Sequence, residues 1–281
     1  MAAYERVLVE IAAGIGSVTL HRPEKLNAFD SAMCDELLEA LRLLSGSEAV
    51  RVITLTGAGR AFCAGADLGV LGRDGPALVA AGKAVALAIR GAPQPVLAAV
   101  NGPAAGGGAN LALACDYRIA SDQASIGQVF HKLGLVPDWG GTFFLPRLVG
   151  TSKALELVWS ARMVPAAEAR DLGLFDRVVP HARLASEARA LAESWSAQPP
   201  SAVRRAKAAL YGSDTEALEA VLDLEILHQN ELFATPEVRE RIAGGASIAK
   251  RSSAIFGAGV ESNSGNHSGR PMSLNIQHFG L

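Results

Sequence analysis

The sequence is poor in cysteine, with Cys34, Cys63 and Cys115 far apart in a chain of 281 residues. An odd number of widely spaced cysteines excludes a disulfide framework, and no CxxC pair indicates zinc. We therefore expect the protein to work in the reducing cytosol. The opening residues "MAAYERVLVE" carry charge from Glu5 onward, so we expect no signal peptide there.

Neither positive nor negative charge predominates, since the net charge is only -2. This balance leaves no broad basic face for nucleic acid, which we do not expect as a partner. Residues 96–115 contain no charged side chain over about the length of a membrane span. They contain Pro103 and four glycines, however. We therefore interpret them as a buried strand, a turn and a small-residue helix, and expect no membrane partner.

The usual motifs for nucleotides, metals and nucleophiles are missing. "GAGRAF" and "GGGANL" lack the third glycine of a dinucleotide fingerprint, and no GxxxxGK[ST] loop occurs. There is no GxSxG elbow and no HExxH pair, and the six histidines are scattered. We therefore expect neither a resident cofactor nor a bound metal.

The hydrophobic residues that are present, 49% of the chain, predict a substantial α/β core. "RVLVEI", "GSVTLHRP" and "RVITLTG" are typical of strands. Asp30 is placed to cap a helix over "SAMCDELLEALRLLSG", and "PALVAAGKAVALAIRG" predicts another helix. "DYRIASDQASIGQ" favours strands, "WGGTFFLPRLVG" and "TSKALELVWSA" favour helices, and "PAAEARDLGLFDRVVP" favours a helix followed by a strand.

Beyond about His181 the strand signal disappears and helical patterns take over. We therefore predict a core over residues 1–195 that contains the active site, and a helical region over residues 196–257. Residues 258–281 are rich in glycine, serine and asparagine, which is typical of a mobile extension or a foreign linker.

Two segments repeat one pattern: "VITLTGAGRAFCAGADL" and "VLAAVNGPAAGGGANLALA" each run from a strand through small residues into a helix. Small residues let a ligand approach the backbone, and a helix start presents free N–H groups. Two such turns side by side can aim two N–H groups at one oxygen. Tight packing of strand against helix also needs glycines, so the pattern leaves both interpretations open.

Four motifs in order, "HRPEKLNAF", "GAGRAFCAGADL", "VNGPAAGGGANLALACDYRIAS" and "GLVPDWGGTFFLPRLVG", closely resemble the crotonase superfamily, the enoyl-CoA hydratase/isomerase group. The likeness covers roughly residues 5–257. It implies a spiral core of repeated β-β-α turns and C-terminal helices that drive assembly into a trimer or a dimer of trimers. It also implies an acyl-CoA thioester substrate, as in fatty acid metabolism.

The resemblance further implies which residues form the site. The backbone N–H groups of Ala66 and Gly107 would form an oxyanion hole for the enolate of the thioester. Alternatives remain for two of the candidate coenzyme A contacts, since Asp67 can simply cap the next helix and Lys25 can simply be solvated. The candidate contacts are Lys25, Leu26, Ala28, Ala64, Asp67 and Leu68, with Lys250 and Phe256 as weaker candidates at the nucleotide end.

The chain departs from the hydratase pattern at both glutamates that activate water in that branch. Asn110 stands at one position and Phe130 at the other, and neither side chain is a general acid or base at neutral pH. Asp138 stands where hydratases usually have glycine. The surrounding "FHKLGLVPDWGGTFFLPRLVG" resembles the branch that isomerises the ring epoxide of phenylacetyl-CoA, and related enoyl-CoA isomerases.

One carboxylate suffices for such an isomerisation, because it can remove a proton from one carbon and return it to another. An apolar setting should raise the pKa of Asp138 and strengthen it as a base. The alternative is that Asp138 caps a helix that starts at Trp139. Asn110 would position the substrate or a water. Phe130 would shape the acyl pocket or else pack in the core. Trp139 and Phe143 would line the same pocket, or else pack in the core or contact another subunit.

Three functions are consistent with these residues. The first is an isomerase of enoyl-CoA or ring acyl-CoA esters that acts through Asp138. The second is an enoyl-CoA hydratase, a lyase, with an atypical base. The third is a non-catalytic acyl-CoA-binding or scaffolding protein that has kept the fold.

Overall fold

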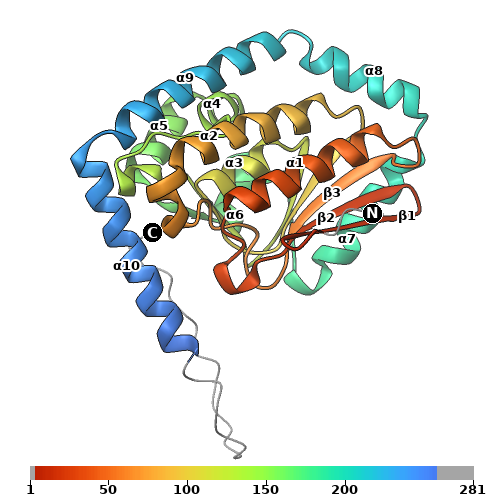
Figure 1. Cartoon of the computed structure of the whole chain (residues 1–281). Helices are drawn as coiled ribbons and strands as arrows, with labels where there is room; N and C mark the ends of the chain where they lie inside the picture. The colour runs from red at the N-terminus through yellow and green to blue at the C-terminus, as the bar shows by residue number, and fades with distance from the viewer. Residues whose placement is uncertain (1–3, 258–281) are drawn as a thin grey trace, which may run out of the picture.

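The computed structural model describes the backbone of residues 4–257 and the side chains of residues 4–247. The expected contacts Lys250 and Phe256 and the expected tail from residue 258 lie outside the described side chains. Within the described part, an α/β body carries a layer of C-terminal helices (Figure 1). None of the described helices is long and apolar enough to cross a membrane.

The main sheet has six strands in the order β1-β2-β3-β4-β6-β9. The first pair is antiparallel and the other neighbours are parallel. Because a parallel sheet is covered on both faces, its strands are continuous apolar runs, and β4 is buried along its whole length. The strands are β1 (Val7–Ala12), β2 (Ile15–Leu20), β3 (Val52–Gly57), β4 (Val96–Val100), β6 (Tyr117–Ser121) and β9 (Arg177–Val179).

A second, three-stranded sheet lies beside the main one, in the order β5-β7-β8. Its strands are short: β5 (Ala104–Ala105), β7 (Ser125–Gly127) and β8 (Met163–Pro165). The chain alternates between the two sheets, since β5 follows β4 and β7 follows β6. A loop and then a helix follow β3 and β4, and these two loops contain the glycine turns.

Helices cover both faces of the main sheet. On one face lie α1 (Ser31–Gly46), α2 (Leu68–Gly91) and α3 (Gly107–Ala114), which share the larger core. On the other face α7 (Leu184–Ser196) packs a smaller core against β2, β3, β4 and β6. The window at residues 96–115 therefore forms a buried strand, a turn and a helix, as predicted.

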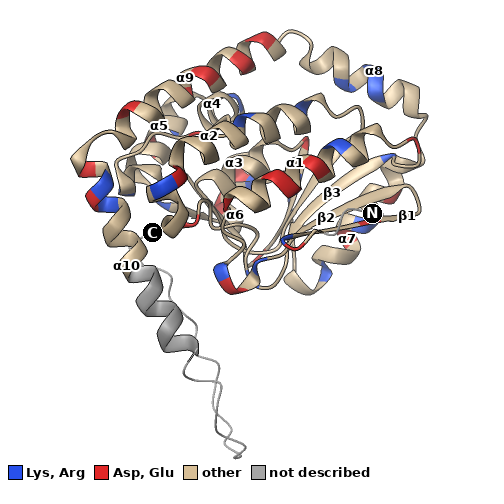
Figure 2. Ribbon diagram, in the orientation of Figure 1, with Lys and Arg blue, Asp and Glu red and all other residues tan. Residues whose placement is uncertain are grey.

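The remaining helices form the C-terminal side of the molecule. In Figure 1, α9 runs along α2 and α10 projects away from the body. Acidic and basic residues are spread over the ribbon in this view, with basic residues on α8 and acidic residues on α9, and they form no single basic face (Figure 2). The helices are α4 (Gly141–Val149), α5 (Thr151–Ser160), α6 (Ala166–Asp171), α8 (Pro200–Tyr211), α9 (Thr215–Phe233) and α10 (Pro236–Gly257), with short 3-10 turns η1 (Pro23–Lys25), η2 (Val129–Leu133) and η3 (His181–Arg183).

Most predicted elements are confirmed, but two helix starts were wrong. Asp30 caps α1 by accepting a hydrogen bond from the Met33 backbone N–H at 2.9 Å, as predicted. The next helix begins at Leu68 and not at Pro76, because a kink at Asp74 allows the proline to start the second part. The helix predicted from Trp139 begins two residues later, at Gly141.

Candidate active site

The two glycine turns lie against each other. Cys63 of the first turn and Ala104 of the second form an isolated parallel bridge, and the Ala105 N–H donates to the Cys63 carbonyl at 2.9 Å. Gly65 has a φ of +90°, and a Cβ there would lie 2.8 Å from the Ala105 carbonyl oxygen and 3.5 Å from the Gly107 nitrogen. Only glycine meets both demands at this position.

The two expected oxyanion donors both have a free N–H group. Among the described residues, neither the Ala66 nor the Gly107 N–H donates to a protein acceptor. Gly107 is the first residue of α3, so its N–H points out of the helix start. The packing interpretation holds as well, since a Cβ on Gly108 would lie 2.3 Å from the Cys63 carbonyl oxygen. The turns thus pack tightly and leave two N–H groups available for an anionic oxygen.

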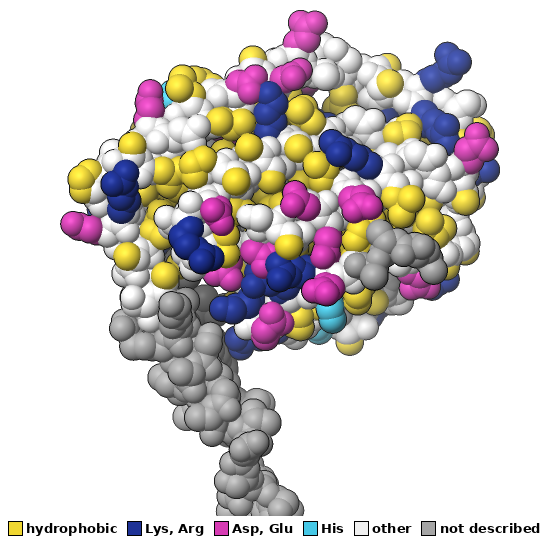
Figure 3. Space-filling view, in the orientation of Figure 1, with side chains coloured by type: hydrophobic (Ala, Val, Ile, Leu, Met, Phe, Trp, Pro, Cys, Tyr) yellow, Lys and Arg dark blue, Asp and Glu magenta, His cyan; other side chains and the backbone are white. Residues whose placement is uncertain are grey.

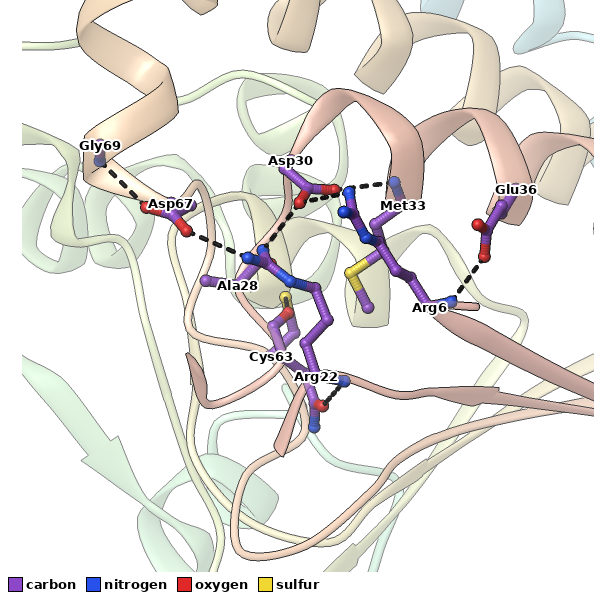
Figure 4. A network of polar contacts seen from close by, with 10 residues as sticks. Arg6, Arg22, Ala28, Asp30, Met33, Glu36, Cys63, Asp67 and Gly69 are labelled. Carbon is purple, nitrogen blue, oxygen red and sulfur yellow. Dashed lines mark hydrogen bonds and ion pairs between the residues drawn. The ribbon is translucent and has the colours of Figure 1, made fainter. Parts of the chain in front are cut away.

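An arginine fixes the predicted coenzyme A segment to the first turn. The Arg22 guanidinium donates to the Ala28 carbonyl at 2.6 Å and pairs with Asp30 and Asp67, each at 3.3 Å (Figure 4). The buried Asn27 side chain donates to the Ala61 carbonyl at 2.8 Å. Sequence reasoning missed both residues, although "HRPEKLNAF" contains them.

The candidate coenzyme A contacts have unequal exposure. Lys25 is exposed at the end of η1, Leu26, Ala64 and Leu68 are half-buried, and Ala28 is buried. Asp67 caps α2 by accepting from the Gly69 N–H at 3.0 Å, so the capping alternative is confirmed for this residue. Its pairing with Arg22 occupies the other oxygen, and a role in binding coenzyme A stays a prediction.

The Asp138 side chain does not cap the following helix. Trp139 and Gly140 have φ values of 52° and 82°, which turn the chain before α4 begins. Glu225 of α9 supplies the cap instead: its carboxylate accepts from the Gly140 N–H at 2.8 Å and the Thr142 N–H at 2.9 Å. The capping alternative for Asp138 is therefore wrong, and its carboxyl is left for another role.

Asn110 supports the segment of residues 134–140 between η2 and α4, which we call the Asp138 loop. Its amide nitrogen donates to the Asp138 carbonyl at 2.7 Å, and its side-chain oxygen accepts from Gln128 at 2.7 Å. Asn110 is completely buried and lies on the first turn of α3, which Gly107 begins. It therefore holds the Asp138 loop at the end of α3 that carries the oxyanion donor. Its predicted contact with substrate stays a prediction.

The Asp138 carboxyl is buried, with 7% of its surface exposed. Burial raises its pKa from 3.8 to about 7, the nearby Glu225 adds to the increase, and a hydrogen bond from Gln229 at 2.9 Å opposes it. A carboxyl with this pKa takes up and releases a proton at neutral pH, as a general base and acid must.

This pKa predicts how the stability of the protein depends on pH. The folded pKa of about 7 lies above the unfolded value of 3.8, so the folded state holds the proton longer. Stability from this group is therefore full at low pH and falls as the pH rises to about 7. The advantage of Asp138→Asn in unfolding free energy should grow by about 1.4 kcal/mol per pH unit across that window. Urea unfolding at several pH values measures it, and a constant difference would contradict the prediction.

The aromatic candidates divide into two groups. Trp139 stacks on Phe29 with centroids 4.3 Å apart, and a Cβ on Gly107 would lie 3.8 Å from its ring. Phe130, in η2, lies 3.7 Å from the Cβ position of Gly106. Both rings therefore border the second glycine turn. Phe143 is buried within α4, with the Arg147 guanidinium 3.5 Å from its ring centre, which favours its core alternative.

Two polar residues of α9 reach this site and were missed by sequence reasoning. The buried side of α9 consists of Leu218, Leu222, Glu225 and Gln229, at successive spacings of four, three and four residues. The signal was therefore present, because the helical period places two polar side chains where leucines are expected. A glutamate and a glutamine at core positions need partners, and the Asp138 loop provides them.

Comparison with known proteins gives a consistent result. The model of a family described as "Enoyl-CoA hydratase/isomerase" matches residues 10–250. The chain is 41% identical over 244 residues to a protein of Rhodobacter capsulatus named "Probable enoyl-CoA hydratase", with 85% of this chain and 94% of that protein covered. It is 37% identical over 261 residues to the "1,2-epoxyphenylacetyl-CoA isomerase" of Escherichia coli, with 90% and 99% covered.

Solved structures agree on the fold. The crystal structure of an enoyl-CoA hydratase from Mycobacterium avium subsp. paratuberculosis superposes with a TM-score of 0.82 at 30% identity, with 86% of this chain and all of that one covered. The predicted crotonase-like α/β fold is thus confirmed. Hydratase and isomerase names both occur among the relatives, so the names alone leave the reaction to the chemistry of the site.

Proposed function

The chain belongs to the enoyl-CoA hydratase/isomerase family, and from this premise we propose that it isomerises an enoyl-CoA double bond or a ring acyl-CoA through Asp138. The Asp138 carboxylate removes a proton from carbon, and the electron pair of that C–H bond forms an enolate on the thioester. The N–H groups of Ala66 and Gly107 hold the enolate oxygen. The protonated Asp138 then returns the proton to a different carbon.

The observation that supports this proposal is the buried Asp138 carboxyl with a pKa of about 7. The two positions where hydratases carry glutamates hold Asn110 and Phe130, neither of which exchanges protons. Both ends of the Asn110 amide are engaged by Asp138 and Gln128. Proton transfer by one group fits this arrangement better than the addition of water, which needs a base and an acid.

Incubation of the protein with a panel of enoyl-CoA esters in D2O, followed by mass spectrometry, tests the proposal. We expect double-bond migration without the mass increase of added water. Deuterium should enter the product only to the extent that the proton on Asp138 exchanges with solvent before it is returned. Hydration of crotonyl-CoA as the main reaction would contradict the proposal. Binding without either change would support the third function, a non-catalytic acyl-CoA-binding protein.

Hydration remains the second candidate because the Rhodobacter capsulatus relative is named a probable hydratase. It would require an atypical base. Glu225 is the other buried carboxyl near the loop, and burial raises its pKa. Its carboxylate is already occupied by three donors from Gly140 and Thr142, however. This engagement favours a supporting role for Glu225 over proton transfer to water.

We also propose that the protein acts in the cytoplasm as a trimer or a dimer of trimers, with the acyl group carried as a coenzyme A thioester and no resident cofactor. Exposed leucines support an assembly: Leu210 on α8, and Leu224 and Leu227 on α9, have from 49% to 77% of their surface exposed. Figure 3 shows further hydrophobic side chains over the middle of the face in view, where α1 and α2 lie. Burial of such surface between copies would stabilise an oligomer.

A further inference from the structure

Two polar side chains of helix α9 contact the Asp138 loop and the start of α4. Glu225 and Gln229 lie four residues apart and therefore project from one side of the helix. They have 3% and 0% of their surfaces exposed, and a buried polar group costs free energy unless it is paired. Both side chains are paired: Glu225 with the backbone at Gly140, and Gln229 with the Asp138 carboxyl.

Glu225 fixes the backbone of the loop. Besides the two backbone N–H groups, it accepts a hydrogen bond from the Thr142 hydroxyl at 2.5 Å. The residue at the N-cap of α4 is Gly140, which has no side chain to satisfy these donors. The carboxylate of α9 therefore serves as the cap that α4 itself lacks, and it holds the chain just after Asp138 in place.

Gln229 contacts the carboxyl itself. Its Nε2 donates to Oδ2 of Asp138 at 2.9 Å, and its own side-chain oxygen has no partner among the described residues. The other hydrogen bond to the Asp138 carboxyl comes from the backbone of Asp138 itself. An amide nitrogen donates and does not accept, whether Asp138 is ionised or neutral. Oδ2 is therefore the acceptor in this arrangement, and a proton carried by Asp138 is favoured on Oδ1, because the carbonyl oxygen of a neutral carboxyl is the stronger acceptor.

We propose that Gln229 is a positioning residue for proton transfer, because its hydrogen bond to Oδ2 makes Oδ1 of Asp138 the oxygen that carries the substrate proton. In the first step the substrate C–H bond breaks, its electron pair stays with the enolate, and an O–H bond forms at Oδ1. In the second step that O–H bond breaks and the proton joins another carbon. This inference rests on the proposed isomerase function.

The charges around Asp138 make this one hydrogen bond important. The titratable groups that influence or are influenced by its carboxyl are Glu225 on α9 and Cys34 on α1. Burial raises the pKa of the Cys34 thiol, which is therefore neutral. No lysine or arginine forms an ion pair with Asp138 in the described part of the chain. The Gln229 amide is thus the side-chain donor that favours the ionised carboxyl.

Separate replacements of Gln229 and Glu225 should shift the pH–rate profile of isomerisation in opposite directions. Gln229→Leu removes a donor that favours the charged form of Asp138, so the acid limb of the pH–rate profile for isomerisation should move up by about one pH unit. Glu225→Gln removes a negative charge near Asp138, so the acid limb should move down. General damage to the site would slow both variants without these opposite shifts.

Gln94→Leu is the matched control. Gln94 is also a buried glutamine whose side-chain oxygen has no partner among the described residues, and its nitrogen donates to the Ser45 carbonyl at 3.2 Å, in another part of the fold. We expect it to lower stability but to leave the acid limb where it is in the wild type. Should Gln229→Leu fail to fold, the near-isosteric Gln229→Glu replaces it, and the limb should again move up.

A measurement without substrate separates this inference from the proposed function. The infrared band of the protonated Asp138 carboxyl is identified by its absence from Asp138→Asn, and its loss with rising pH reports the titration directly. Failure of the wild type to move the double bond of any ester in the panel would reject the isomerase, whereas the infrared band would still show whether Gln229 controls the titration of Asp138. The inference is wrong if, in both Gln229 variants, the infrared band of Asp138 and the acid limb of the pH–rate profile titrate at the same pH as in the wild type.

Discussion

Replacement of Asp138 by asparagine is expected to lower the rate of solvent exchange and isomerisation by about 10²- to 10⁴-fold. The amide has nearly the same shape and can still accept the hydrogen bond from Gln229, but it does not take up a proton at neutral pH. The loss should appear in kcat, while the affinity for the coenzyme A ester changes little. Steady-state kinetics and calorimetric titration of a bound ester measure the two separately.

The control for this experiment is Asp171→Asn, which makes the same chemical change at the exposed end of α6. It should keep wild-type activity. If Asp138→Asn isomerised its substrate at the wild-type rate, Asp138 would not be the base, and Glu225 would become the next buried carboxyl to test. Faster unfolding is not expected, since the variant removes a carboxyl whose charge is unfavourable in the folded state.

The second large effect should follow from removing one oxyanion donor through the backbone. Gly107→Pro deletes the N–H group and is expected to lower kcat by about 10²- to 10³-fold. Proline is well tolerated at the first position of a helix, which is where Gly107 lies. The preceding Gly106, with φ 53° and ψ -125°, does not have the helical conformation that a following proline disfavours.

Gly107→Ala provides the matched comparison, because it adds a side chain and keeps the N–H group. The added Cβ would lie 3.5 Å from the Phe29 ring, an ordinary contact. We expect this variant to retain most of the wild-type kcat. Equal loss in the alanine and proline variants would show that crowding, and not the missing donor, causes the effect; equal retention would show that Gly107 does not hold the enolate oxygen.

Local patterns sufficed for the elements whose signals lie within a few residues of one another. Alternation in "RVLVEI" and the spacing of Met33, Leu37, Leu41 and Leu44 after Asp30 depend on neighbouring residues, and β1 and α1 follow them. The start of α2 was missed because Asp67 caps it eight or more residues before the continuous apolar pattern begins. Asp74, non-helical within it, divides the helix and hides the signal of its first part.

The start of α4 shows why a site is harder to predict than a helix. "VPDWGG" offers Asp138 as a plausible cap, and sequence alone left that alternative open. The actual cap is Glu225, which is 85 residues away along the chain from Gly140. The backbone turns at Trp139 and Gly140, and the two N–H groups that follow the turn are bonded to Glu225 of α9 and not to the Asp138 side chain.

The sequence by itself determined the α/β class, the glycines of the two turns and the presence of one carboxylate where two glutamates are absent. Only the tertiary structure decided what that carboxylate contacts. Gln229 lies 91 residues from Asp138 along the chain, and nothing in either local segment indicates the other. The physical reason is that the pKa and orientation of a buried group depend on every charge and dipole packed around it, and packing brings these together from distant parts of the chain.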